Sequence, residues 1–352
     1  MGQDGGRALN NISTLCKHVM LVSALVSSFG VIAKGFSGLG SGTSWDPYII
    51  TNVNELQEMN NEPSAWYELG NDIDASDTIN WNSGEGFVPI SVFQGTFDGQ
   101  GHNITDLFIN RSRNFQGLFG EVGYILGVEV KNVGLINVHV SGGSHVGGLI
   151  GYDSGGTVEN CFVTGSVIGT AFVGGLVGFI TGGDTISNSY ARVKVNGTYC
   201  VGGLVGQHYC DRIVNSYATG DVEGSYEVGG LVGMNADGTI ENSYSTGKVI
   251  GNTNVGGLVG SGAYEGCTNS FWDNQTSNQS TSACGEGKTT SEMMQKDIFV
   301  NWDFVETWGI EDNQTYPFLK LTYPVGDLNY DKVVNFLDFA IFADHWLDGT
   351  GN

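Results

Sequence analysis

The sequence predicts an all-β fold, a right-handed parallel β-helix whose coils of about 27 residues stack into a solenoid. Two in-phase repeats support this prediction, a glycine-rich pentapeptide and an asparagine, each of which returns six times at steps of 27 to 31 residues. The pentapeptide begins at Gln116, Gly147, Gly174, Gly202, Gly229 and Gly256. The asparagines are Asn132, Asn160, Asn188, Asn215, Asn242 and Asn269. Leucine-rich repeats have a compatible period, but their L-x-x-L-x-L run is missing, and propeller blades need about 40 residues or more.

Each coil is expected to contain three short strands separated by Gly, Asn, Asp and Ser. In the strand around Ile240, two-residue alternation predicts that Ile240, Asn242 and Tyr244 face inward, while Glu241, Ser243 and Ser245 face solvent. Stacking coils in register then creates columns of equivalent side chains. The predicted buried leucine column is Leu118, Leu149, Leu176, Leu204, Leu231 and Leu258. The aromatic column is Phe162, Tyr190, Tyr217, Tyr244 and Phe271. The asparagine amides are expected to hydrogen-bond from coil to coil.

The N-terminal residues 1–34 have the pattern of a secretory signal peptide. Arg7 and Lys17 precede an apolar run over residues 19–32, and an alternative start at Met20 would move the cleavage site without changing the prediction of export. The apolar run is short for a membrane span, so we expect no integral span after the signal is removed.

The remaining chain divides into a repeat region and its caps. Residues 43–114 are predicted to form the N-terminal cap and first coils, residues 115–273 the repeat β-helix, and residues 274–322 the C-terminal capping region. Capping boxes at Asn52-x-x-Glu55 and Thr289-x-x-Glu292 predict short helices that cover the open ends. Residues 323–352 form a separate C-terminal segment.

The composition of the chain excludes some classes of binding partner. The chain has 14 Lys and Arg against 37 Asp and Glu, a net charge of −23, which argues against binding to nucleic acid or anionic membranes. Together with the signal pattern, this charge favours a secreted or cell-surface protein. Five cysteines follow the signal. Cys200 and Cys210 flank one pentapeptide and could pair, whereas Cys267 occupies the position of Ile240 and is expected to be a plain core residue.

The repeat, with Val-Gly-Gly-Leu-Val-Gly at residues 228–233 and Thr-Ile-Glu-Asn-Ser-Tyr-Ser-Thr-Gly at residues 239–247, resembles the GLUG motif. That motif occurs in bacterial and archaeal surface and secreted proteins, including some immunoglobulin-A peptidases. The flanks resemble the same proteins, at Asp-Pro-Tyr-Ile-Ile (46–50), Gly-Thr-Phe-Asp-Gly-Gln-Gly-His (95–102), Phe-Trp-Asp (271–273) and Gly-Glu-Gly-Lys-Thr-Thr (285–290). The resemblance implies a surface or secreted location and covers about half of the chain.

The C-terminal segment predicts a calcium site. Oxygen ligands fall at EF-hand loop positions 1, 3, 5, 9 and 12, with a backbone carbonyl at position 7 and an apolar helix after the loop. The ligands are Asp327, Asn329, Asp331, Asn335 and Asp338, with the carbonyl of Val333. This loop is similar to half of a dockerin, which implies Ca²⁺ and a cohesin-like scaffold partner. Lys332 replaces the usual turn glycine, the second loop copy is absent, and Phe336 and Leu337 replace small hydroxyl residues. The alternative is a tail whose Phe339, Phe342 and Trp346 pack on the solenoid end.

Catalytic signals are sparse. No H-E-x-x-H, G-x-S-x-G or P-loop pattern occurs, and the five histidines after the signal are expected to be surface or turn residues. Asp184 and Asp211 lie four residues before their ladder asparagines, which places them on adjacent coils near the spacing of a retaining glycosidase, although both also suit ordinary turns. The basic residues of the repeat are scattered over three coils, as solvated side chains would be. They are Arg192, Lys194, Arg212 and Lys248.

These observations predict a secreted or surface β-helical protein of structural or adhesion type, which contacts glycans or proteins through its flat polar faces. A calcium-dependent C-terminal element would attach it to a partner. The alternative is a carbohydrate-active enzyme, or an accessory subunit, of an extracellular polysaccharide-degrading system.

Overall fold

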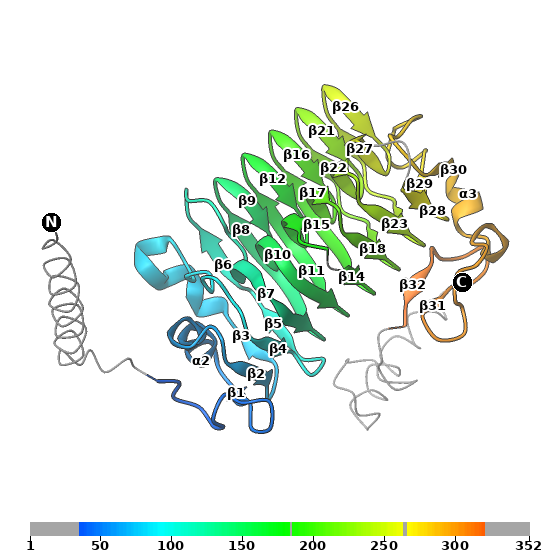
Figure 1. Ribbon diagram of the computed structural model, residues 1–352. Helices are drawn as coiled ribbons and strands as arrows, with labels where there is room; N and C mark the ends of the chain where they lie inside the picture. The colour runs from blue at the N-terminus through cyan, green and yellow to red at the C-terminus, as the bar shows by residue number, and fades with distance from the viewer. Residues whose placement is uncertain (1–34, 184, 263–265, 321–352) are drawn as a thin grey trace, which may run out of the picture.

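The computed structural model describes residues 35–183, 185–262 and 266–320 of the chain. These residues form a parallel β-solenoid whose coils stack from the N-terminal cap to the C-terminal cap (Figure 1), which confirms the predicted fold class. The predicted signal peptide and calcium loop lie outside the described residues. None of the helices within the described ranges is long and apolar enough to cross a bilayer.

Three sheets run along the solenoid, and their strands pair in parallel. The first contains β1 (Tyr48–Ile50), β2 (Trp66–Leu69), β4 (Thr96–Asp98), β7 (Phe119–Lys131), β10 (Ile150–Glu159), β13 (Val177–Thr181), β17 (Val205–Tyr209), β22 (Val232–Ala236) and β27 (Val259–Gly262), with β14 (Thr185–Ser187), β18 (Arg212–Val214), β23 (Thr239–Glu241) and β28 (Cys267–Thr268). The second contains β3 (Ile73–Asp74), β5 (Asn103–Thr105), β6 (Phe108–Asn110), β8 (Gly134–Ser141), β11 (Phe162–Ile168), β15 (Tyr190–Asn196), β19 (Tyr217–Ala218), β20 (Val222–Glu223), β24 (Tyr244–Ser245), β25 (Val249–Ile250), β29 (Phe271–Asp273) and β30 (Glu286–Lys288). The third contains β9 (Ser144–Gly147), β12 (Ala171–Gly174), β16 (Tyr199–Gly202), β21 (Tyr226–Gly229) and β26 (Thr253–Gly256).

The predicted columns organise the interior. All six leucines of the pentapeptides are fully buried, and so contribute about 1.5–3 kcal/mol each to the hydrophobic free energy of folding. Phe162, Tyr190, Tyr217 and Tyr244 stack with ring centroids 4.8–4.9 Å apart. Phe271 pairs in register with Tyr244 but packs edge-on against Phe299 of the C-terminal cap.

The asparagine ladder is confirmed, but it bends the chain in a way that simple alternation does not predict. Each ladder asparagine has a φ of 47–55°, the left-handed region that asparagine tolerates better than most residues. Hydrogen bonds between side-chain amides join neighbouring asparagines, as where Asn215 Nδ2 donates to Asn188 Oδ1 at 3.2 Å. The bend at Asn242 turns the following residues inward, so the prediction that Ser243 and Ser245 face solvent is wrong, and both are buried.

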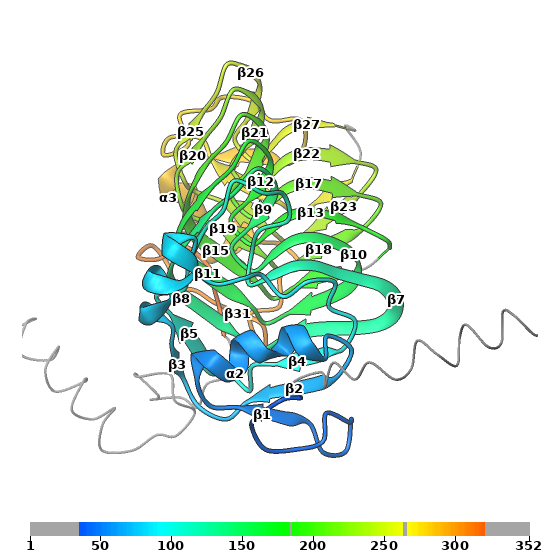
Figure 2. The same cartoon turned by 90° about the vertical axis from the view of Figure 1, so that its left-hand side faces the viewer.

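Both ends are capped. At the N-terminal end, α2 (Val53–Glu58) and the 3₁₀ helices η2 (Met59–Asn61) and η3 (Ser76–Gly84) lie beside the first strands (Figure 2). Asn52 caps α2 as predicted, although Glu55 accepts from the N–H of Thr51 and not from that of Asn52. At the other end, Thr289 and Glu292 form a complete capping box that begins α3 (Thr290–Met293). There η4 (Lys296–Ile298) and the antiparallel pair β31 (Trp308–Gly309) and β32 (Phe318–Leu319) complete the cap.

The cysteines correct one prediction. Cys267 is bonded to Cys284 in a disulfide that joins the last coil to the C-terminal cap, so it is not a plain core residue. Cys200 and Cys210, which could have paired, are not disulfide-bonded. The pairing was missed because Cys284 lies beyond the last repeat, where repeat spacing gives no position for it.

Candidate binding surface

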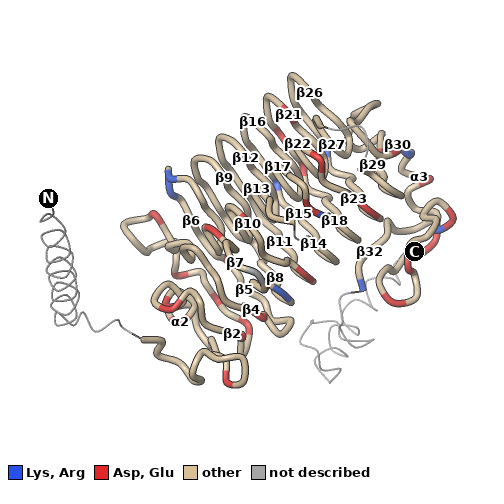
Figure 3. The backbone as a smooth tube through the Cα atoms, viewed as in Figure 1, with Lys and Arg blue, Asp and Glu red and all other residues tan. Residues whose placement is uncertain are grey.

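The two carboxylates considered as catalytic candidates, Asp184 and Asp211, are not seen together, because Asp184 lies outside the described residues. Asp211 is 2% exposed, and its Oδ1 accepts a hydrogen bond from the N–H of Gly183 at 2.6 Å on the preceding coil. Asp237, on the next coil, is exposed at the end of a strand. Asp211 therefore stabilises a turn between coils. Asp and Glu positions are spread along the length of the described tube, whereas Lys and Arg positions are fewer (Figure 3).

The structure corrects two further expectations, that every histidine lies at the surface or in a turn and that Arg192 is only solvated. His208 is fully buried, so the expectation that every histidine lies at the surface or in a turn is wrong. Arg192 is solvent-exposed but not merely solvated, since its guanidinium lies 5.2 Å from the centroid of the Tyr190 ring and donates to the hydroxyl of Tyr217 at 3.2 Å.

A cluster of rings forms the most distinctive surface of the solenoid. It lies where β9 and β12 pass into β10 and β13, and we call it the aromatic patch. Its residues are Phe115, Tyr124, His145, Tyr152, Phe172 and Phe179. His145 is central, with its ring centroid 4.9 Å from that of Phe115 and 4.7 Å from that of Phe172. Tyr124 is 53% exposed and the other five are partly buried, so ring surface remains open to a ligand.

The patch is built on two columns of the solenoid that later coils fill with different residues. One column runs from Phe115 through His145 and Phe172 and continues as Cys200, Glu227 and Asn254. The other runs from Glu121 through Tyr152 and Phe179 and continues as Gln207, Met234 and Ser261. The same coil geometry therefore forms without aromatic residues, so the rings are not a requirement of the fold.

The backbone under the first column makes the rings there more unusual. The whole column is left-handed, with φ values of 60° at Phe115 and His145, 54° at Phe172, 50° at Cys200, 57° at Glu227 and 55° at Asn254. Bulky side chains are disfavoured in this left-handed region, whereas asparagine is enriched in it. The two phenylalanines thus occupy positions at which the fold alone favours asparagine.

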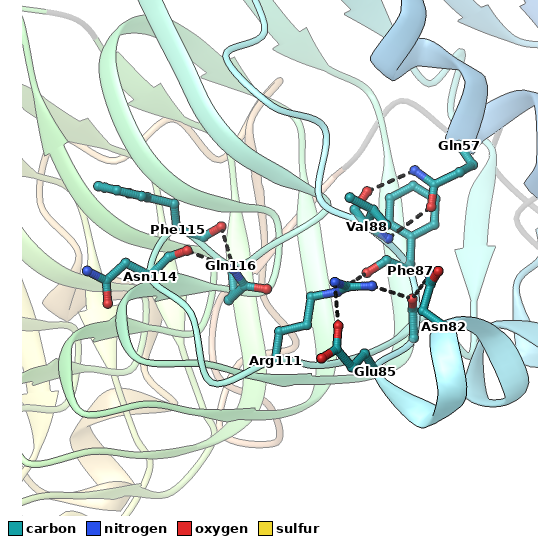
Figure 4. Close-up of polar contacts among 10 residues, drawn as sticks. Gln57, Asn82, Glu85, Phe87, Val88, Arg111, Asn114, Phe115 and Gln116 are labelled. Atoms are coloured by element: carbon teal, nitrogen blue, oxygen red, sulfur yellow. Dashed lines mark hydrogen bonds and ion pairs between the residues drawn. The ribbon is translucent and has the colours of Figure 1, made fainter.

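The loop that presents Phe115 is held from both sides (Figure 4). The buried Gln116 side chain donates to the carbonyls of Asn114 and Phe115 at 2.7 and 3.0 Å, and Asn114 Oδ1 accepts from the N–H of Ser144 at 3.0 Å. Arg111, which is 8% exposed, anchors the start of the loop to the N-terminal cap. The loop that carries Phe115 is therefore preorganised, which reduces the entropy lost when a ligand binds.

The polar groups of the patch are neutral donors and acceptors beside one carboxylate. Burial lowers the pKa of His145, an effect that Glu121 partly opposes, so the imidazole is uncharged at pH 7. Burial and Glu121 raise the pKa of Tyr124 to about 12, and its hydroxyl donates to Glu121 at 2.7 Å. Ring faces edged by hydroxyl, imidazole and carboxylate groups suit a ligand with both apolar and hydroxyl-bearing surfaces.

Sequence reasoning missed this patch, although a signal for it exists. Tyr152 and Phe179 directly follow the pentapeptide glycines, and His145 and Phe172 directly precede the Val-Gly-Gly of their coils. These positions vary between repeats, and a column that is aromatic in neighbouring coils predicts a cluster of rings.

A second pair of exposed rings lies outside the patch. Tyr199 and Tyr226 stack on the third sheet with ring centroids 4.9 Å apart.

The repeats can be compared with known families. The GLUG motif matches residues 142–168, 197–223 and 224–250, three coils of the solenoid of which the last two are consecutive. The chain contains GLUG motif repeats. The first matched segment carries His145 and Tyr152 of the patch, whereas Phe172 and Phe179 lie on the coil between matched segments. The dockerin-like resemblance of residues 323–352 stays a prediction.

Two curated proteins and one solved structure resemble this GLUG-repeat chain. Halomucin of Haloquadratum walsbyi is 37% identical over 155 residues, which are 40% of this chain and 2% of halomucin. A protein of Evansella cellulosilytica named as a Gly-rich membrane protein is 30% identical over 169 residues, 45% of this chain and 19% of that protein. The chain thus spans a small part of either relative.

A similar solved structure is a crystal structure of a protein from Bacteroides ovatus assigned as an immunoglobulin A1 protease. It superposes with a TM-score of 0.62 at 23% identity, over 80% of this chain and 95% of that one. At this level of identity the likeness supports the β-solenoid fold and carries nothing about activity.

Proposed function

We propose that this protein is an extracellular glycan-binding solenoid whose ligand lies across the aromatic patch. The observation that carries the proposal is the concentration of rings in two columns that later coils fill with Cys200, Glu227 and Asn254, or with Gln207, Met234 and Ser261. Nothing in the coil geometry requires rings there, and at Phe115 and Phe172 the backbone disfavours them. A ligand that contacts the rings accounts for both facts.

The chemistry of the patch favours a saccharide. A pyranose presents an apolar C–H face that packs on an aromatic ring, together with a rim of hydroxyl groups that donate and accept hydrogen bonds. The rings of Phe172 and Phe179, 5.7 Å apart, offer the apolar surface, while Tyr124, Glu121 and Tyr152 offer polar groups at its edge. The rings lie on three neighbouring coils, which stack about 4.8 Å apart, so ring contacts can repeat along an extended saccharide.

An extracellular location is part of the proposal. It is supported by the signal pattern of residues 1–34 and by the Cys267–Cys284 disulfide, because disulfides persist in oxidising compartments. The relative named as a membrane protein is consistent with the same setting. The predicted calcium loop at residues 327–338 would attach the solenoid to a scaffold or surface.

The test is retention of the purified full chain, with calcium, on immobilised neutral and acidic polysaccharides. Phe172→Asn and Phe179→Gln place in the patch the residues that Asn254 and Gln207 already hold in other coils, so the fold should persist. We expect the double variant to lose tenfold or more of the affinity, on the order of two ring contacts. Tyr226→Thr, which copies Thr253 in register, removes an exposed ring elsewhere and should leave retention unchanged.

Two results would contradict the proposal. Equal retention of the double variant and the wild type would show that the rings do not contact the ligand, and absence of wild-type retention on every polysaccharide would remove glycan binding. New reducing ends that appear with the wild-type chain would instead support the alternative of a polysaccharide-degrading enzyme.

A further inference from the structure

A concave site apart from the aromatic patch lies on the N-terminal cap. It is a cleft of about 690 Å³ between the α2–η2 helices and the segment that follows Trp81 at the end of η3. The cleft is lined by Gln57, Asn60, Asn61, Trp81, Asn82 and Val88. Its volume falls within the range of small-molecule sites. The lining differs from that of the aromatic patch, because it combines four side-chain amides with one indole and contains no ionisable group.

The walls of the cleft are fixed by hydrogen bonds between its own elements. Gln57 bonds in both directions with the backbone of Val88, with its Nε2 donating to the carbonyl and its Oε1 accepting from the N–H, each at 2.9 Å (Figure 4). Asn60 Oδ1 accepts from the N–H of Ser91 at 2.9 Å. The helical side and the loop side of the cleft are therefore held at one separation.

A buried arginine supports the loop side from beneath. Arg111 donates to the carbonyls of Phe87 and Gly86 at 3.0 Å each and pairs with Glu85 at 2.8 Å. Its guanidinium thus fixes three consecutive residues next to Val88. Trp81 stacks on Phe87 with ring centroids 6.4 Å apart and is itself partly exposed, so one part of the indole is anchored while another remains accessible.

The turn beside Trp81 is also strained. Asn82 and Ser83 have φ values of 51° and 58°, and Gly84 continues the left-handed run at 88°. Asn82 Nδ2 donates to the carbonyl of Gly86 at 2.7 Å, which stabilises the turn. A run of left-handed residues is unfavourable for a plain loop, and such conformations persist where the surrounding structure enforces them.

We propose that this cleft binds a neutral saccharide residue, with its C–H face on Trp81 and its hydroxyl groups on the amides of Gln57, Asn60, Asn61 and Asn82. The proposal names a second site for the glycan-binding function and shares with it only the class of ligand. After their structural bonds are counted, Gln57 and Asn82 each keep an amide N–H and an oxygen lone pair for a ligand. Hydroxyl groups, which both donate and accept, satisfy such a mixed set.

Two features of the lining select this ligand over others. The absence of charged side chains among the six lining residues disfavours a phosphate, a carboxylate or a cation, since a charged ligand would be desolvated without a partner. A peptide that adds a strand requires an unpaired sheet edge, whereas the cleft presents side-chain amides and a ring.

The experiment is calorimetric titration of the full chain with neutral hexasaccharides of glucose, mannose and N-acetylglucosamine, with an uncharged hexapeptide as a further probe. We expect Trp81→Ala to weaken saccharide binding about tenfold and Trp81→Phe, which keeps a ring, to weaken it no more than about threefold. Ile79→Ser changes a 53% exposed side chain on η3 outside the cleft lining and should have no effect. The Phe172→Asn, Phe179→Gln double variant should retain this binding event.

A second variant protects the test against misfolding of Trp81→Ala. Asn82→Gly keeps the left-handed turn and removes one amide, and it should lower saccharide affinity about threefold while circular dichroism stays unchanged. The proposal is overturned if Trp81→Ala and Asn82→Gly bind as the wild type does, or if the peptide binds and no saccharide does. Loss of all saccharide binding in the patch double variant would also overturn it, while leaving the function proposed for the patch intact.

Discussion

Replacing His208 by isoleucine should remove a defined part of the pH dependence of stability. His208 is fully buried in a column where the preceding coil carries Ile180 and the following coil Asn235, so isoleucine already fits this geometry. Burial lowers the pKa of the imidazole to about 4, against the raising effects of the Asn235 side chain and the Asp211 backbone. The ring lies against Gly238, where a Cβ would come within 2.2 Å of it, so little room is left for water around a charged ring.

The magnitude follows from linkage. An unfolded histidine titrates at 6.5, so between pH 6.5 and about 4 the unfolded chain binds a proton that the folded chain excludes. The stabilisation is therefore fully present above pH 6.5 and falls as the pH drops toward 4. At 1.36 kcal/mol per pH unit, the difference between a pKa of 6.5 in the unfolded chain and about 4 in the folded chain corresponds to about 3 kcal/mol.

Guanidinium unfolding followed by circular dichroism at pH 7.5, 6.0, 5.0 and 4.0 measures this difference. The free energy of unfolding of the wild type should fall by about 3 kcal/mol more than that of His208→Ile over the range. His145, whose pKa burial also lowers, is present in both proteins, so its contribution cancels in the comparison. Parallel pH curves for the two proteins would refute the buried, uncharged state of His208.

Three further predictions test the ladder, the disulfide and the tail. Asn215→Ala should lower the unfolding free energy by about 1–2 kcal/mol more than Asn215→Gly in the same denaturation assay, because alanine is strained at a φ of 48° and glycine is not. Equal losses would mean that the side-chain hydrogen bonds of the ladder account for the whole effect. The double change Cys267→Ser, Cys284→Ser should cost about 3 kcal/mol for a closed loop of 17 residues, and a reductant that lowers the wild-type melting temperature should leave the double variant unaffected. Asp327→Ala should weaken calcium binding in a calorimetric titration, and an unchanged isotherm would remove the predicted loop.

The columns of the solenoid could be predicted because the sequence repeats the positions that stacking needs. Leu204 and Asn215 recur at fixed offsets, and a period near 27 residues leaves few folds other than a solenoid. Strand alternation failed at Ser243, since the left-handed asparagine before it changes which face the chain presents. That conformation is itself foreseeable from the asparagine, but its consequence for the next residue requires the turn geometry.

The candidate sites were harder to predict, because each depends on contacts between segments distant in sequence. The cleft brings Gln57 beside Val88, and its support comes from Arg111 on a later coil. The patch joins residues on both sides of a sheet corner, where the pentapeptide passes from one sheet to the next. A period fixes which residues stack, but not which neighbouring columns meet at a corner.

Variation between coils does not by itself identify function. His208 departs from its column as clearly as Phe172 departs from its own, yet His208 is fully enclosed and can affect only stability. Phe172 differs in two ways, because its ring is partly exposed and its backbone favours another residue type. A ring that leaves apolar surface in water on a left-handed backbone lowers stability on both counts. The ligand contact that we propose would account for rings in three neighbouring coils, at Phe115, His145 and Phe172.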